Sequence, residues 1–278
     1  MEVVMWFKAY LEEYQFFPVI NLSDEEERKI FDNKLTLKEA KIYFFIQSKA
    51  KFKNVRFLKN EEKLNCKIIN ESNEVYSFSI KHSFPTRILT PPSNKFSKLI
   101  NKIFMNNISS ILEINTNNPN KPTFIHLFQV VNGAKNVNLP KNFLKSEIVY
   151  LGKSDNAKGI LHGRVYRHEK TLPILGKLGV LNDEILIFVF KINLVDEAKN
   201  LPNDIYIPVV EEILIRYFQP RENREYLTTK TATSKHWKKM QNLGFTDYCI
   251  EMNFDDDVCC FGTSKKEFRT KHLILGKF

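Results

Sequence analysis

The spacing of hydrophobic and polar residues near the start of the chain predicts two helices. A hydroxyl residue is followed three positions later by a glutamate at Ser23 and Glu26, and again at Thr36 and Glu39. Such capping boxes satisfy free backbone N–H groups at a helix start. We therefore predict one helix beginning at each box, the second running into the apolar residues 40–46.

The pattern then changes to short strands and a longer amphipathic segment. Tyr76, Phe78 and Ile80 alternate with serines, which is the period of a half-buried strand. Residues 96–112 carry apolar side chains at helical spacing and predict an amphipathic helix. The predicted strands of this region are 55–58, 66–69 and 75–80.

An Asn- and Pro-rich segment at 115–122 is the best candidate for a linker, because both residue types favour turns. It predicts three units: a mixed α/β N-terminal domain at 1–118, a second domain at 119–230, and a C-terminal extension at 231–278. In the second unit we predict strands at 124–131, 147–151 and 185–192 and helices at 161–169 and 209–218. In the extension we predict a helix at 234–243 and a hairpin of 248–254 with 258–261.

Composition adds two alternatives for the surface chemistry. The formal net charge is +10, the pI is about 9.2, and 43% of residues are hydrophobic. Such basicity favours a polyanionic partner such as DNA, and it is equally typical of a Lys-rich surface without such a partner. The first 14 residues do not resemble a signal peptide, and no stretch reaches the ~20 apolar residues of a membrane span. We expect a cytoplasmic protein without a membrane partner.

The four cysteines show no C-x-x-C spacing, so they indicate neither a zinc site nor a redox pair. The residues that point to chemistry follow the predicted linker. Breaking a phosphodiester needs an activated water, positive charge at the phosphate and often one hard metal ion. Residues of these types occur in order: Tyr150, Lys153, Arg164 with His168, and Glu211.

Three short motifs resemble those of the GIY-YIG nuclease family. Tyr150-Leu151-Gly152-Lys153-Ser154 is similar to the YIG strand of that family. The run 164–168 (Arg-Val-Tyr-Arg-His) resembles its Arg-containing helix. The run 211–223 resembles its Glu-x-x-Leu-Ile and Pro-x-x-Asn stretch. The resemblance implies an α/β (α+β) fold, with a small mixed sheet flanked by helices beside the additional N-terminal domain.

The resemblance also implies residue roles. Tyr150 would handle the proton of the attacking water, Arg164 would face the phosphate, and Glu211 would hold Mg²⁺ or Mn²⁺. Supporting roles at the phosphate, the leaving group and the frame of the site would fall to Lys153, Arg167, His168 and Asn223.

The chain departs from the family pattern where the first Gly-Ile-Tyr strand is expected. Residues 124–128 occupy that place, and either His126 or Phe128 stands at the position of the missing tyrosine. A shift of one residue exchanges the two faces of a strand, so both registers remain open. His126 is able to move a proton, with an ordinary pKa of about 6.5, whereas Phe128 is not.

The sequence therefore predicts a metal-dependent endonuclease acting on DNA in restriction, defence or repair. The alternative is a catalytically inactive nucleic-acid-binding module. A third hypothesis is a partner protein whose basicity is incidental. Each residue also has an ordinary structural explanation: Tyr150 as a strand aromatic, Lys153 as a turn residue, and Glu211 at a helix start. DNA or RNA preference, the role of the N-terminal domain and a possible homo-oligomer stay open.

Overall fold

The protein was examined as a computed structural model. It describes residues 4–18, 39–61, 63–81, 100–105, 110–116, 123–133, 139–140, 143–154, 185–223, 234–254 and 259–278. Strands dominate these residues and form one eight-stranded and two three-stranded sheets. The large sheet has the order β13–β12–β9–β2–β10–β1–β11–β14. Its strands are β1 (Trp6–Pro18), β2 (Ile42–Ser48), β9 (Leu144–Lys153), β10 (Ile185–Val195), β11 (Asp247–Asn253), β12 (Cys259–Thr263), β13 (Lys266–Arg269) and β14 (Lys271–Lys277).

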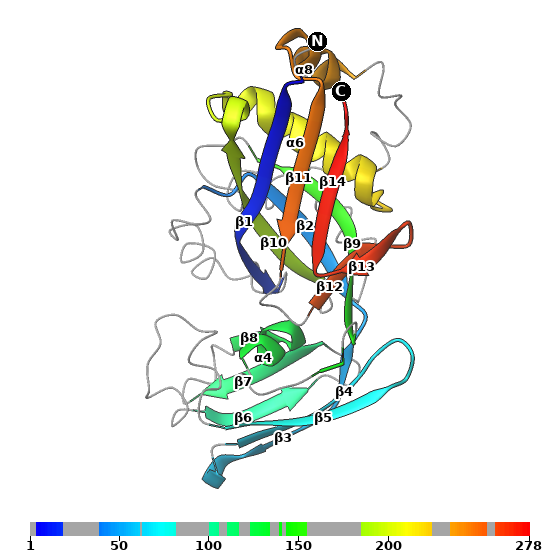
Figure 1. The fold of residues 1–278 in the computed structure, drawn as a ribbon. Coiled ribbons are helices and arrows are strands. Elements are labelled where there is room, and N and C mark those ends of the chain that lie inside the picture. Colours follow the sequence, from blue (N-terminus) through cyan, green and yellow to red (C-terminus); the bar gives the residue numbers. More distant parts are fainter. Residues whose placement is uncertain are drawn as a thin grey trace.

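The large sheet curls around one helix, α6 (Asn203–Phe218), until the sheet nearly closes (Figure 1). From Val209 to Ile215 every residue of this helix is buried. A helix that is apolar on most sides must be covered on most sides, which accounts for the curl. Near the two edges, Nε2 of His272 on β14 hydrogen-bonds to the Phe261 carbonyl oxygen on β12 (2.9 Å).

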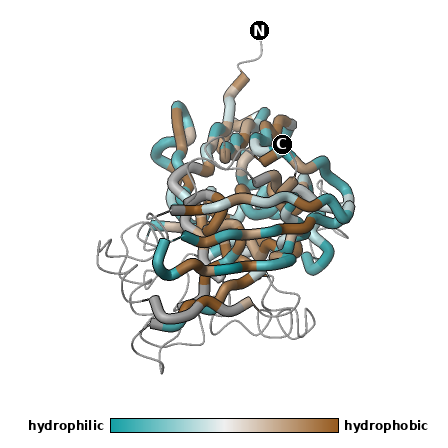
Figure 2. Tube along the Cα trace, turned by 90° about the horizontal axis from the view of Figure 1, so that it is seen from below, coloured by the Kyte–Doolittle hydropathy of each residue, from teal (hydrophilic) through white to brown (hydrophobic). Residues whose placement is uncertain are grey.

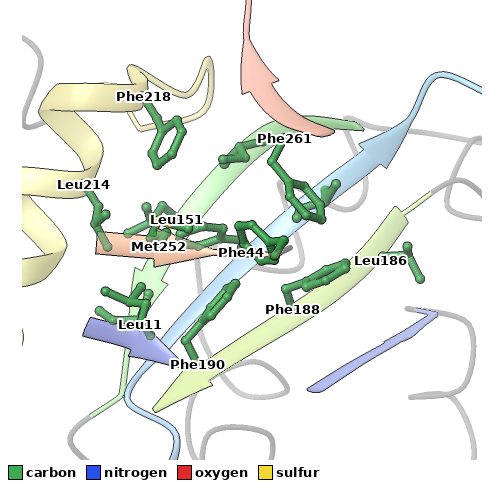
Figure 3. Close-up of a cluster of buried hydrophobic side chains, with 14 of the residues drawn as sticks. Leu11, Phe44, Leu151, Leu186, Phe188, Phe190, Leu214, Phe218, Met252 and Phe261 are labelled. Atoms are coloured by element: carbon green, nitrogen blue, oxygen red, sulfur yellow. The ribbon is translucent and has the colours of Figure 1, made fainter. Parts of the chain in front are cut away.

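Phenylalanine fills the space between the helix and the sheet (Figure 3). The ring of Phe188 lies 4.9 Å from that of Phe261, and the rings of Phe44 and Phe190 are 4.8 Å apart. Leu214 and the Phe218 ring approach them from α6. Large buried rings contribute a few kcal/mol each through loss of water-exposed area, so this cluster contributes strongly to stability.

Two smaller sheets lie below the large one in Figure 1, and β3 contacts β6. Both sheets are antiparallel. Seen from below, hydrophilic and hydrophobic residues alternate along the nearer strands (Figure 2), as expected for sheets with one face on a core. The first sheet is β3 (Lys51–Leu58), β4 (Lys63–Ile69) and β5 (Val75–Lys81), with the 3₁₀ turn η2 (Lys59–Glu61). The second is β6 (Ile100–Met105), β7 (Ile111–Thr116) and β8 (Thr123–His126).

The other helical elements are short. The helix α4 (Leu127–Gly133) follows β8 directly, and the 3₁₀ turn η5 (Asp196–Ala198) follows β10. The helix α8 (Lys235–Asn242) begins at Ser234, whose hydroxyl oxygen accepts from the N–H groups of His236 and Trp237. This capping bond satisfies two donors that a helix start otherwise leaves open.

The fold expected from the nuclease resemblance is wrong. A small mixed sheet flanked by helices was predicted, and the protein is instead mostly β, with α6 inside a nearly closed eight-stranded sheet. The error arose because short apolar runs fit a strand and a buried helix equally well, so several strands were read as helices.

Residues 40–46 show this error most clearly. They were predicted as helix after a capping box, and residues 42–48 form β2 in the middle of the large sheet. The run Ile42–Ile46 is buried on both faces of the sheet. Continuous burial of β-branched and aromatic residues favours a central strand, and it outweighed the local capping signal.

Three other predicted elements were also wrong in type or pairing. The helix at 96–112 is replaced by β6 and β7, which pair antiparallel. The strand at 124–131 ends at His126 and continues as α4. The hairpin does not form, because β11 pairs with β1 and β14 whereas β12 pairs with β9 and β13. Pairing partners depend on distant segments, which local spacing does not encode.

Other predictions were confirmed. The strands at 55–58, 66–69 and 75–80 lie in β3, β4 and β5, and those at 147–151 and 185–192 lie in β9 and β10. The helix at 234–243 is α8, while the helix at 209–218 begins earlier, at Asn203. The predicted helices at 23 and 161–169 lie outside the described residues. Strands from all three predicted units share the large sheet and one core.

Gly152 gives a first prediction. It pairs with Tyr43 across β9 and β2, and a Cβ at position 152 would lie 2.5 Å from Cζ of the Tyr43 ring. Gly152→Ala is therefore expected to lower the free energy of unfolding by about 1–3 kcal/mol, measured by urea denaturation. In a Tyr43→Ala background the same change is expected to cost much less. Equal losses in both backgrounds would contradict this packing role.

Candidate functional site

The residues predicted to act together at Tyr150 are divided between the two faces of β9. Tyr150 is 8% exposed, and its ring lies 5.6 Å from the ring of Phe45 and 6.1 Å from that of Tyr43. Leu151 belongs to the core around α6, as Figure 3 shows. Successive strand residues point to opposite faces, so Tyr150 faces away from α6 while Lys153 faces it.

Two of the predicted residues do meet. The Lys153 ammonium nitrogen lies 3.2 Å from Oε2 of Glu211, and the side chains are 19% and 10% exposed. Glu211 does not begin its helix as predicted but lies in the middle of α6. The two charges compensate each other, which is the usual condition for carrying charges into a partly buried position.

Glu212, the next residue of α6, connects this helix to the start of α8. Its Oε1 accepts hydrogen bonds from Nε (2.9 Å) and Nη2 (2.7 Å) of Arg216, and its Oε2 accepts one from the Ser234 hydroxyl (2.6 Å). The Arg216 guanidinium in turn lies 5.6 Å from the Trp237 ring centroid. Glu212 is 1% exposed, so these bonds satisfy a carboxylate that burial alone would strongly disfavour.

His236 completes this group. Burial lowers its pKa, the charge of Glu212 raises it, and the charge of Lys153 lowers it. We call this group the polar junction: Lys153, Glu211, Glu212, Arg216, Ser234 and His236. Its ion pairs and hydrogen bonds connect β9, α6 and the start of α8, so the arrangement is suited to holding these elements together.

Asn223 braces β9 from the side. Its Oδ1 accepts from the Leu151 N–H (2.8 Å), its Nδ2 donates to the Leu151 carbonyl (2.7 Å), and the Glu222 N–H donates to the Val149 carbonyl (3.2 Å). The strand β12 pairs with β9 only as far as Glu147. The segment after α6 therefore continues the hydrogen bonding of that edge up to the end that carries Lys153.

His126 and Phe128 do not stand beside Tyr150. His126 ends β8, which pairs with β7 in a different sheet from β9. Its Nδ1 accepts from the Phe128 N–H (3.0 Å), and complete burial lowers its pKa to about 3. The Phe128 ring packs 4.6 Å from that of Phe16. Both side chains are buried core residues, so neither replaces the missing tyrosine in the described structure.

The remaining predicted residues, Arg164, Arg167 and His168, lie outside the described residues. Within the described ranges, no group of three or more His, Cys, Asp or Glu side chains is placed to hold a metal ion. Glu211 is held by Lys153, and an ion at its carboxylate would have to displace that ammonium. Binding of Mg²⁺ or Mn²⁺ at Glu211 stays a prediction.

A second polar feature lies on the open face of the β3–β4–β5 sheet. A groove of about 400 Å³ is lined there by Asn54, Arg56, Lys63, Asn65, Cys66, Lys67, Ser77, Phe78 and Ser79. The strand register puts Lys67 between Asn54 and Ser77, and Asn65 between Arg56 and Ser79. Lys63 follows on the next rung along β4. Neighbouring strands thus present cations and neutral polar groups together.

This basic groove, defined by those nine residues, contains no carboxylate among them. Among the described residues, none forms an ion pair with Arg56, Lys63 or Lys67. Sequence reasoning identified the three strands but not the groove. The signal was the alternation of polar residues in each strand, and the missing information was the register that brings three cations to one face.

Comparison with known proteins finds no matching family model, no matching curated protein and no matching solved structure. None of the described helices is both long enough and apolar enough to cross a membrane.

Titration of His126 gives a second prediction. The neutral form is favoured in the folded protein, with a pKa of about 3 against an ordinary 6.5. Between these values the unfolded chain binds the extra proton, so stability falls as pH decreases from about 6.5 towards 3. The slope from one such group approaches about 1.4 kcal/mol per pH unit.

His126→Asn places its Oδ1 where Nδ1 lies, so it keeps an acceptor for the Phe128 N–H, and it removes the titration. Urea denaturation between pH 7 and pH 4 is expected to show a shallower pH dependence in this variant. Burial also lowers the pKa of His272, so the decisive quantity is the difference between the slopes of wild type and variant. Identical slopes would contradict the buried neutral histidine.

Proposed function

We propose that the protein binds nucleic acid through the basic groove. The observation that carries the proposal is the alignment of Arg56, Lys63 and Lys67 on adjacent rungs of one open sheet face, with only uncharged polar and apolar residues between them. Cations without an ion-pair partner among the described residues attract a polyanion, and the excess of ten positive charges over the whole chain acts in the same direction.

The uncharged residues of the groove match the same ligand. Asn54, Ser77 and Ser79 are exposed on this face. Hydroxyl and amide groups, together with Arg and Lys, supply most protein contacts to phosphate and sugar oxygens. The Ser79 hydroxyl donates to Oδ1 of Asn65 (2.7 Å), which leaves the Asn65 amide N–H groups as donors towards a ligand.

Binding is favoured over catalysis by the geometry around β9. Tyr150 faces the opposite side of the sheet from Lys153 and Glu211, so these three residues do not surround one reacting group. A general base must come within hydrogen-bond reach of the proton it takes. The basic groove requires no such convergence, because attraction of phosphates depends on net positive charge.

The third prediction concerns the groove. The double variant Arg56→Ala with Lys67→Ala is expected to weaken binding of a fluorescent oligonucleotide at least about tenfold at low salt, since each phosphate contact contributes to affinity. Fluorescence anisotropy measures the change. The matched control, Lys238→Ala with Lys277→Ala, removes two exposed lysines outside the groove and should change affinity little. Equal weakening in both would show that only total charge matters.

Phosphodiester hydrolysis is the second candidate function. The specific observation in its favour is that Lys153 and Glu211, distant in sequence, lie 3.2 Å apart with part of each side chain accessible. Both residue types are used in phosphoryl chemistry, Lys at the phosphate and Glu as a metal ligand. The candidate ranks second because the ion pair engages both groups.

The fourth prediction tests hydrolysis with supercoiled plasmid in the presence of Mg²⁺ or a chelator. If the protein nicks DNA at this site, Glu211→Gln is expected to abolish nicking while oligonucleotide affinity stays within about twofold. The control Glu267→Gln changes an exposed carboxylate on β13 and should leave nicking unchanged. Absence of nicking by the wild-type protein, or unchanged nicking by Glu211→Gln, would remove this candidate.

A further inference from the structure

We infer that the basic groove binds the phosphate backbone of a nucleic-acid duplex over about three phosphates and does not read bases. This inference rests on the proposed function and specifies its ligand. Arg56, Lys63 and Lys67 supply three cationic contacts on one face of the β3–β4–β5 sheet.

The spacing follows from the strand register. Lys63 and Lys67 are four residues apart on β4, which is roughly 13 Å along a strand. Arg56 lies on the adjacent strand opposite Asn65, midway between them. Each cation is thus roughly 8 Å from the next at the backbone, given a strand separation of about 4.8 Å. Long side chains at this spacing can each reach a different phosphate.

By strand alternation the aromatic side chains of the sheet belong to its other face, although Phe78 also borders the groove. Phe57 pairs with Leu64, Phe78 with Cys66, and all four pack with the hydrophobic core. In the described structure, the exposed large hydrophobic side chains include no aromatic ring. Proteins that hold single strands gain about 1–3 kcal/mol per base by stacking on exposed rings.

Among the described residues, the groove therefore offers no exposed aromatic ring on which unpaired bases could stack. A duplex keeps its bases stacked and presents its phosphates outward. Its affinity for a surface therefore does not depend on aromatic rings. Asn54, Ser77 and Ser79, located between the cations, add hydrogen bonds to phosphate oxygens. Since such contacts carry no sequence information, the geometry favours binding that is independent of base sequence.

The test is the salt dependence of binding, measured by anisotropy with the full chain. For a B-DNA duplex, three phosphate contacts give a slope of log Kobs against log[salt] of about −3. Single changes Arg56→Ala, Lys63→Ala and Lys67→Ala should each make the slope shallower by about 1. Lys238→Ala, in α8, is the matched control and should leave the slope unchanged.

Further arms identify the ligand. Two duplexes of unrelated sequence should bind within about twofold of each other, and oligo(dT) of the same length should bind at least about fivefold more weakly, for lack of stacking. Inorganic polyphosphate at equal phosphate concentration should compete poorly, because its chain lacks the fixed duplex geometry.

The outcomes separate the two proposals. If no nucleic acid binds in any arm, the proposed function fails. If nucleic acid binds but prefers the single strand or one sequence, is displaced equally by polyphosphate, or shows slopes that the groove variants do not alter, this inference fails and nucleic-acid binding stands.

Discussion

The fold depends on the burial of α6. Its residues from Val209 to Ile215 are covered on every side, including two glutamates. A single flat sheet covers one side of a helix, so the eight strands must bend around it, and the edges are brought near enough for His272 to reach the Phe261 carbonyl. The glutamates remain tolerable because Lys153, Arg216 and Ser234 approach them from β9, α6 and the start of α8.

This constraint separates the charged groups of the protein into two kinds. In the polar junction every described charge has a partner, and the energy of each pair mainly offsets the cost of removing it from water. On the β3–β4–β5 face Arg56 and Lys67 are exposed and Lys63 is partly exposed, so their field extends towards a ligand. Similar residue types thus serve cohesion at one place and recognition at another, and burial decides which.

Sequence patterns predicted those elements whose character is local. Alternation in Tyr76, Phe78 and Ile80 identified β5, and the position of Ser234 before a helical run identified α8. They did not predict β2, because a run of buried aromatic residues has no period. They also missed the start of α6, because Pro208 lies inside that helix.

The candidate sites show the same limit. Lys153 and Glu211, which the sequence grouped, lie in contact, and Asn223 holds Leu151 through two hydrogen bonds, while the roles of these residues at a phosphate stay predictions. The opposite orientation of Tyr150 follows from strand alternation. It was missed because the position of α6 relative to β9 was unknown. The basic groove required the register of three strands, which only long-range packing determines.

The position of β1 in the sheet affects how the nascent chain folds. This strand of 13 residues lies between β10 and β11, which begin at Ile185 and Asp247. During synthesis it leaves the ribosome before the other described strands of its sheet, while both of its hydrogen-bonding partners are made much later. Structures rich in such distant pairings fold slowly and expose unpaired strand edges meanwhile. The sheet can therefore close only after β11 and β14 have been made, and until then β1 keeps an unpaired edge that other strands could pair with.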